Sequence, residues 1–188
     1  MRPPNSPDRG NPRQSLWQAL TEQLEELDLG PFHSVAELRE IASRRRGRRI
    51  EAMPFPLRGT NISGLLLVTP EADLILYEQD APAYHQEHIQ LHELSHVLLG
   101  HVDEQEPSGT GVLAQLQDND SLARLHGHTV DKVLQRTDYE EHTEHEAETM
   151  ASILAMRLRQ HVDQRTSAPE SEELRRIGRS LSPTRRAE

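Results

Sequence analysis

Residues 91–100 of the chain read LHELSHVLLG, and their pattern predicts the helix around which the other elements are arranged. On an α-helix, residues four apart lie one above the other on the same face, so His92 and His96 project together. The opposite face carries an apolar stripe that can be buried: Leu91, Leu94 and Leu98. The stretch therefore predicts a helix that is buried on its leucine side and carries two histidines on the other.

The ends of this helix are marked by residues with strong terminal preferences. Proline is favoured at the first helical position, and Pro82 precedes Ala83 at the start of the pattern. Gly100 supplies the residue type that most readily adopts the left-handed conformation that ends a helix. We therefore predict a helix from Pro82 or Ala83 to Leu99, with both histidines inside it.

The spacing of His92, Glu93 and His96 matches the H-E-x-x-H pattern of zinc hydrolases. Two imidazole nitrogens can hold one ion, and the metal acidifies a water molecule that it binds. Glu93 lies beside the ion rather than on it, where a carboxylate can take the proton of that water. Random order of this composition gives about 0.07 such matches, so the pattern predicts a zinc site with Glu93 as the catalytic base.

A hydrolytic zinc site has a third protein ligand. His101 is the nearest candidate, but it follows His96 by five residues, beyond the predicted helix end at Gly100. The extended metzincin pattern requires glycine and histidine three and six residues after the second motif histidine, where this chain has Leu99 and Val102. We therefore predict that His101 is a helix-end residue.

Residues 144–148 read EHEAE and offer a better third ligand. Glu144 and Glu148 lie four apart on a predicted helix, so Glu144 can bind the ion while Glu148 accepts from the outer nitrogen of a ligand histidine. The predicted ligands of Zn²⁺ are His92, His96 and Glu144. Glu146 and Glu148 remain alternatives to Glu144, and another divalent metal would also suit these ligands.

The remaining periodicity predicts helices and short strands around this centre. An apolar stripe indicates a helix from Ser15 that ends at Gly30, and a second short helix follows Ser34. Three β-type segments come next, the last two forming a hairpin: 50–53, 64–69 and 74–77. A long helix is predicted over 137–161. The predicted fold class is α+β, with a small antiparallel-containing sheet packed against the zinc helix and additional helices.

The apolar content is uneven along the chain and indicates one domain with polar ends. Residues 1–13 contain four prolines among polar residues and predict a disordered leader. The single domain is predicted over 14–162 and includes a long polar insertion loop at 103–136. Residues 163–188 are predicted to be a mostly disordered tail.

Composition excludes several classes of protein. The 188 residues include no cysteine, which excludes disulfides and thiolate metal ligands. The formal net charge of −10 argues against a broad nucleic-acid surface, so no direct nucleic-acid partner is expected. The basic run RRRGRR at 44–49 predicts a solvated helix end. Apolar runs are too short for a signal peptide or membrane helix, so we expect a cytoplasmic protein with no membrane partner.

Three segments together resemble the ImmA/IrrE family of metallopeptidases: GLLLV at 64–68, LHELSHVLLGH at 91–101 and EHEAETMA at 144–151. The resemblance implies a zincin-like fold of the gluzincin kind, in which two histidines and one glutamate bind zinc. It also implies cleavage of a protein substrate, often a helix-turn-helix transcription regulator encoded nearby. The chain departs from the family pattern where Glu148 replaces Asn or Asp, where Met150 replaces Phe, and in the long insertion.

The sequence thus predicts a zinc-dependent endopeptidase that cleaves a protein substrate, and the resemblance implies that this substrate is a partner transcriptional regulator. The alternative is a non-proteolytic binding module, with a structural or vestigial zinc site, that holds a helix-turn-helix partner. Glu93 favours the enzyme, because a structural zinc site has no need of such a carboxylate. Hydrolysis also requires a group that stabilises the oxyanion, and three candidates remain open: His126, His128 and Tyr139.

Overall fold

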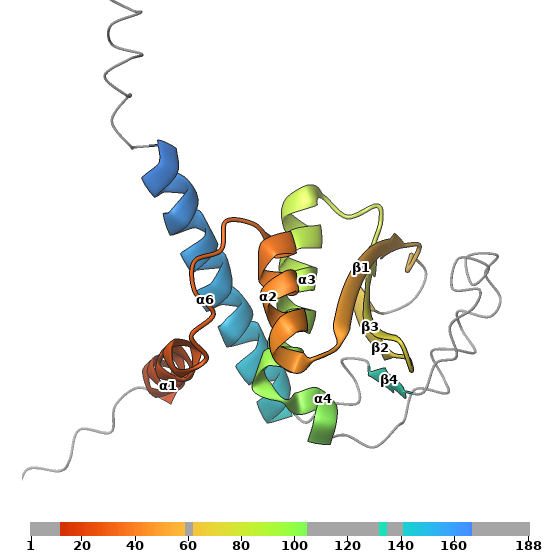
Figure 1. Ribbon diagram of the computed structural model, residues 1–188, viewed down its shortest axis with the longest axis horizontal. Helices are drawn as coiled ribbons and strands as arrows, with labels where there is room; N and C mark the ends of the chain where they lie inside the picture. The colour runs from red at the N-terminus through yellow and green to blue at the C-terminus, as the bar shows by residue number, and fades with distance from the viewer. Residues whose placement is uncertain (1–11, 59–61, 105–131, 135–140, 167–188) are drawn as a thin grey trace, which may run out of the picture.

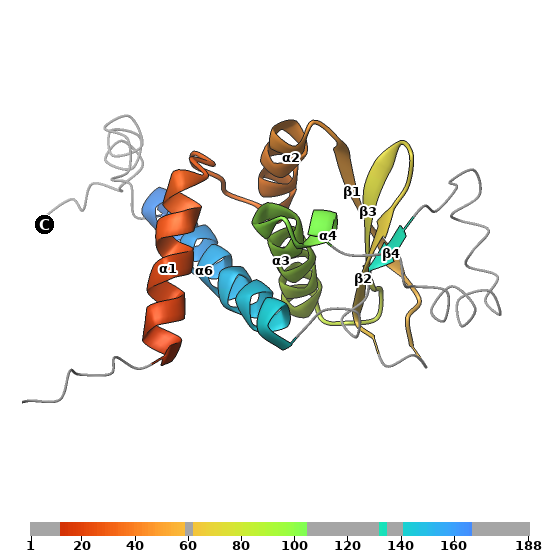
Figure 2. The same ribbon diagram turned by 90° about the horizontal axis from the view of Figure 1, so that it is seen from below.

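A computed structural model describes residues 12–58, 62–104, 132–134 and 141–166. The chain forms a mixed α+β fold, in which the long helices lie on one side of a single small sheet and only some of them contact it (Figures 1 and 2). The predicted α+β class is confirmed at this level, as is the packing of the sheet against the helix that carries the H-E-x-x-H pattern.

The first helix, α1 (Pro12–Glu26), begins inside the predicted leader. Proline is tolerated in the first turn of a helix, where its missing N–H has no intrahelical partner to lose. The prediction of disorder is therefore wrong for residues 12–13, while residues 1–11 lie outside the described part of the chain. Leu20 and Leu24 of the predicted stripe are buried.

The second helix, α2 (Val35–Arg46), is bounded by a cap at each end. The Ser34 side chain accepts a hydrogen bond from the Glu37 backbone N–H at 3.1 Å, which satisfies an N-terminal donor that the helix itself cannot pair. Gly47 ends the helix in the left-handed conformation with φ of 68°. The predicted start after Ser34 is confirmed.

The sheet has the strand order β1-β3-β2-β4. Its strands are β1 (Arg49–Phe55), β2 (Gly64–Val68), β3 (Ala72–Glu78) and β4 (Lys132–Leu134). The predicted hairpin is confirmed, because β2 and β3 pair antiparallel with Leu66 opposite Ile75. β1 pairs parallel to β3, and it continues through Pro54 because an edge strand has a side on which the missing N–H costs no ladder bond.

β4 lies within residues 103–136, which were predicted to be a loop. It pairs antiparallel with β2, placing Val133 opposite Leu67. A three-residue strand carries too little periodicity to stand out in a polar segment. The same predicted loop also begins inside a short helix, α4 (His101–Glu104), whereas residues 105–131 and 135–136 lie outside the described part of the chain.

Two long helices complete the fold: α3 (Ala83–Leu99) and α6 (Glu141–Thr166). Gly100 ends α3 with φ of 82°, as predicted. Within the described residues α6 continues past the predicted end at 161, so residues 163–166 are helical rather than part of a disordered tail. Residues 137–140 and 167–188 are not described.

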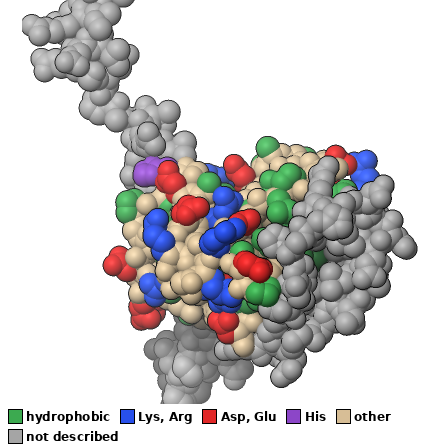
Figure 3. All heavy atoms as spheres, turned by 45° about the vertical axis from the view of Figure 1, so that its right-hand side comes forward, with side chains coloured by type: hydrophobic (Ala, Val, Ile, Leu, Met, Phe, Trp, Pro, Cys, Tyr) green, Lys and Arg blue, Asp and Glu red, His purple; other side chains and the backbone are tan. Residues whose placement is uncertain are grey.

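Both faces of the sheet are buried, because successive side chains of a strand point to opposite faces. The face toward the helices contributes Ile50, Leu66 and Ile75 to the main core. The other face forms a second cluster that includes Leu65, Leu67, Leu74 and Leu76. None of the described helices combines the length and the apolar character that crossing a membrane requires. On the face shown in Figure 3, acidic and basic side chains of the described residues are interspersed.

An ion-pair group centred on the buried carboxylate of Asp73, here called the Asp73 cluster, connects β3 with α2, α4 and the segment between α2 and β1; its members are Asp73, Arg46, Arg48 and Asp103. Arg46 Nε lies 2.6 Å from Asp73 Oδ2, and Arg48 Nε lies 3.1 Å from Asp73 Oδ1. Arg46 also donates two hydrogen bonds to Asp103, each 3.0 Å long. The prediction of a solvated helix end at 44–49 is therefore wrong for Arg46 and Arg48, whose guanidinium groups pair with the buried carboxylate of Asp73.

Candidate metal centre

The two motif histidines are presented on the face of α3 opposite its buried leucines. Leu91 and Leu94 pack into the main core, which fixes the rotation of α3 about its own axis. The helical period then places His92 and His96 one turn apart on the other face. The His96 side chain is fully buried, and the His92 side chain is nearly so.

Glu144 reaches the two histidines from the first turn of α6. Ala147 and Ala151 are fully buried one and two turns further on, and their small side chains allow α6 to approach α3 closely. A carboxylate in the first turn is also favoured by the positive end of the helix dipole. The packing of α3 on α6 thus brings together residues that are 48 positions apart in sequence, from His96 to Glu144.

The three ligand atoms are spaced as one small ion requires. His92 Nε2 lies 3.2 Å from His96 Nε2, and Glu144 Oε1 lies 3.4 Å from His96 Nε2. The other carboxylate oxygen, Oε2, lies 3.6 Å from His92 Nε2. Zinc bonds of about 2.0–2.2 Å at tetrahedral angles would separate neighbouring ligand atoms by about 3.3–3.6 Å. A divalent ion such as Zn²⁺ therefore fits this set of donors.

Burial and charge shift the pKa values of the two histidines in opposite directions. Burial, reinforced by neighbouring histidines, lowers the pKa of His96 to about 4 despite the carboxylate of Glu144. Burial also acts to lower the pKa of His92, but the surrounding carboxylates, above all Glu148, outweigh it and raise that pKa. His96 is consequently neutral at pH 7 and keeps a lone pair for a metal ion.

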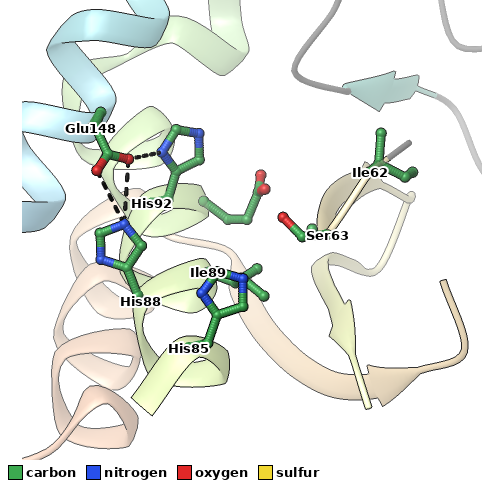
Figure 4. A pocket seen from close by; sticks show the side chains of 9 residues that line it. Ile62, Ser63, His85, His88, Ile89, His92 and Glu148 are labelled. Carbon is green, nitrogen blue, oxygen red and sulfur yellow. Dashed lines mark hydrogen bonds and ion pairs between the residues drawn. The ribbon is translucent and has the colours of Figure 1, made fainter. Parts of the chain in front are cut away.

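Glu148 contacts the outer nitrogen of His92, as the sequence suggested. Its Oε2 lies 3.5 Å from His92 Nδ1, and its Oε1 lies 3.2 Å from His88 Nε2 (Figure 4). Hydrogen bonding to His92, together with His88, lowers the pKa of Glu148 to about 2 against the opposing effect of burial. A carboxylate in this position fixes the ring orientation and tautomer of a ligand histidine. His88 was not singled out from the sequence, although it lies one helical turn before His92.

Glu93 borders a cavity of about 400 Å³ beside the histidines. The cavity lies between α3 and the start of β2, with Ile62 and Ser63 on the strand side and His85 and His88 on the helix side (Figure 4). Glu93 itself is only 7 % exposed. The arrangement places the Glu93 carboxylate at the wall of a cavity that His92, one of the three candidate metal donors, also lines.

Gly64 lets β2 approach α3 at this wall. A Cβ atom at position 64 would lie 2.4 Å from Ile89 Cγ2 and 2.7 Å from Glu93 Oε1, both well inside van der Waals contact. The absence of a side chain at Gly64 therefore allows the Glu93 carboxylate to occupy its observed position. The sequence placed Gly64 only at the start of a strand and gave it no part in the site.

The remaining candidates from the sequence fall into two groups. Glu146 and His101 lie away from the three donor atoms: Glu146 Oε2 is 3.4 Å from His101 Nε2, and His101 Nδ1 is 3.1 Å from His96 Nδ1. His101 does follow the end of α3, but it is 5 % exposed and begins α4, so the helix-end description was incomplete. The three oxyanion candidates, His126, His128 and Tyr139, lie outside the described residues.

No protein family, curated protein or solved structure matches the chain.

Proposed function

We propose that this protein is a zinc-dependent endopeptidase in which His92, His96 and Glu144 bind the metal and Glu93 is the catalytic base. The observation that carries the proposal is the convergence of three donor side chains, whose nitrogen and oxygen atoms lie 3.2–3.6 Å apart, beside a cavity that Glu93 borders. Each part has a structural alternative by itself, since buried histidines and acidic helix turns are common. Their combination matches what hydrolysis of a peptide bond requires.

In the proposed mechanism a single residue of the chain, Glu93, transfers the proton. A bound divalent ion would supply Lewis-acid chemistry, acidifying water and polarising a peptide carbonyl. Glu93 accepts a proton from the water that attacks the carbonyl carbon, and then donates it to the nitrogen of the departing amine.

The fold that we propose for this centre is zincin-like, of the gluzincin kind. It is supported by a sheet packed on the motif helix α3 and by a third donor from the later helix α6. The ImmA/IrrE family is proposed on the three sequence segments that resemble it. The same resemblance is the basis for proposing a helix-turn-helix transcription regulator as the protein substrate.

The proposal is tested by incubating the purified, zinc-loaded protein with a proteome-derived peptide library and identifying new peptide termini by mass spectrometry. We expect new termini that disappear when the metal is chelated. Glu93→Gln should reduce their rate of formation by about 100-fold or more, because it removes the proton acceptor while keeping the volume. Glu87→Gln, on the exposed side of the same helix, is the matched control and should cleave at the wild-type rate.

The binding-module alternative makes the opposite prediction in the same experiment. A protein of that kind would bind zinc, yield no metal-dependent termini, and retain a helix-turn-helix protein uncut in a pull-down. Full cleavage by Glu93→Gln would contradict the proposed role of that residue. Cleavage that is insensitive to chelation would contradict the proposed metal chemistry as a whole.

A further inference from the structure

His101 lies directly behind the candidate ligand His96. The two Nδ1 atoms are 3.1 Å apart, on the side of the His96 ring turned away from Glu144. His101 is held in place by the left-handed turn at Gly100, which ends α3 and starts α4 one residue later. Its side chain is buried, so this contact is shielded from solvent.

The direction of the hydrogen bond between His96 and His101 follows from the position of the single proton on each neutral ring. A neutral histidine carries one proton, and one that offers Nε2 to a metal must carry it on Nδ1. His96 Nδ1–H therefore donates, and His101 Nδ1 accepts. The proton of a neutral His101 must then be on its own Nε2, which lies 3.4 Å from Glu146 Oε2.

Glu146 comes from the same helical turn as Glu144, so α6 contributes one carboxylate that contacts His96 directly and one that reaches it through His101. Glu144 lies at the metal-facing nitrogen, and Glu146 lies at the far end of the path through His101. The other oxygen of Glu146 is 3.3 Å from His142, whose side chain is 72 % exposed, so the path ends at the surface. His92 differs, because a carboxylate, that of Glu148, contacts its outer nitrogen directly.

We propose that His101 and Glu146 are positioning residues for His96, acting in series to hold its ring and its Nδ1–H tautomer ready for a metal ion. The inference rests on the proposed metal-binding role of His96 but not on peptide hydrolysis. Outer hydrogen-bond partners of ligand histidines commonly contribute about 10- to 100-fold to metal affinity. Glu146 has its effect only through His101, so the two contributions cannot be independent.

The experiment measures the zinc Kd of the full chain by competition with a chromophoric chelator. We expect His101→Leu to weaken zinc binding by about 10- to 100-fold, and Glu146→Ala by about 10-fold. His101→Gln should recover part of the loss, because its amide can accept from His96 and donate to Glu146. The double variant should bind no more weakly than His101→Leu alone. His145→Ala removes an exposed histidine from the same helix and should leave the Kd unchanged.

A second readout separates positioning from a general loss of structure. In the zinc-loaded protein, nitrogen-15 NMR of the histidine rings should show His96 protonated at Nδ1 and His101 protonated at Nε2. His101→Gln should preserve the His96 signal, and thermal unfolding of each metal-free variant reports whether it folds. Glu146→Ala changes a partly exposed carboxylate and keeps the test open if His101→Leu does not fold.

The outcomes distinguish this inference from the proposed function. Unchanged zinc affinity in both single variants, or fully additive losses in the double variant, would overturn the positioning role while leaving the ligand set intact. A His96 ring protonated at Nε2 in the zinc-loaded protein would do the same. Wild type that binds zinc no better than His96→Ala would overturn the proposed metal site and this inference with it.

Discussion

Two buried carboxylates in this fold are stabilised in different ways. Asp73 is 0 % exposed, and each of its oxygens has an arginine Nε within 3.1 Å. Glu144 is largely buried too, but its oxygens face the ring nitrogens of His92 and His96 at 3.4–3.6 Å. One carboxylate is paired with permanent cations, and the other is grouped with side chains that are charged only when protonated.

The difference follows from the chemistry of the two basic side chains. Arginine stays protonated at every pH at which the protein is folded, so the Asp73 cluster carries its own counter-charges. Histidine at pH 7 offers a lone pair, and burial lowers the pKa of His96 to about 4, which favours that form. The Asp73 cluster is therefore a closed structural unit, whereas the His92–His96–Glu144 group is suited to receive a cation from outside.

The largest expected effect on stability comes from removing the central carboxylate of the Asp73 cluster. Asp73→Asn leaves the partly buried Arg46 and Arg48 without the carboxylate that they share, and should lower the free energy of unfolding by about 3–5 kcal/mol. Urea unfolding of the metal-free protein measures this. Asp80→Asn, which changes a half-exposed carboxylate, is the control and should stay within about 0.5 kcal/mol of wild type. A loss below about 1 kcal/mol for Asp73→Asn would show that the two clusters do not differ in this way.

The next largest effect tests whether the His92–His96–Glu144 group binds zinc. If the donors bind zinc only in the folded state, free zinc at 100-fold above the Kd should raise the free energy of unfolding by about 2.7 kcal/mol. Glu144→Gln should lose most of this gain, while Asp73→Asn should keep it as far as it remains folded. Urea unfolding in zinc buffers gives both values. Equal zinc stabilisation of wild type and Glu144→Gln would contradict the assignment of the third ligand.

The sequence predicted the His92–His96–Glu144 group better than the Asp73 cluster, for a physical reason. His92 and His96 are related by one helical turn, so their common face follows from local periodicity alone. The position of Glu144 depends on how closely α6 packs on α3, and the small side chains of Ala147 and Ala151 permit a close approach. Local pattern and short side chains are visible in a sequence. Here they were sufficient to predict the three donors that the fold brings together.

The Asp73 cluster carried no comparable signal. A run of arginines at a helix end is usually solvated, and nothing local indicates that Arg46 pairs with a carboxylate 27 residues later. That contact depends on β1 pairing parallel to β3, a long-range choice that strand propensity does not determine. His101 was undervalued for the same reason, because its burial depends on where α4 packs rather than on its spacing from His96.

Gly64→Ala is expected to act on the cavity wall at Glu93, and by a smaller amount. The new methyl group would meet Ile89 and Glu93, so one of them must move. We expect a loss of about 1–2 kcal/mol in stability, because such overpacking strains the core. The displaced Glu93 should slow peptide hydrolysis by up to about 100-fold. The zinc Kd, measured on the same sample, should change by less than about threefold, since no donor atom is touched.

A parallel loss of zinc affinity in Gly64→Ala would mean that the strand supports the donors and not only Glu93. Unchanged hydrolysis would mean that the carboxylate tolerates the shift. Either result would change the account of how β2 shapes the cavity, while leaving the comparison of the two clusters intact.

The smallest effect concerns the exposed member of the Asp73 cluster. Asp103 accepts two hydrogen bonds from Arg46, but its side chain is 66 % exposed, and water can replace much of what it offers. Asp103→Ala should therefore cost at most about 1 kcal/mol in urea unfolding, and less at high salt. In Asp73→Asn the same substitution should cost more, because Arg46 then has only this carboxylate. Equal costs in the two backgrounds would show that Arg46 does not couple them, and that Asp73 is stabilised through Arg48 instead.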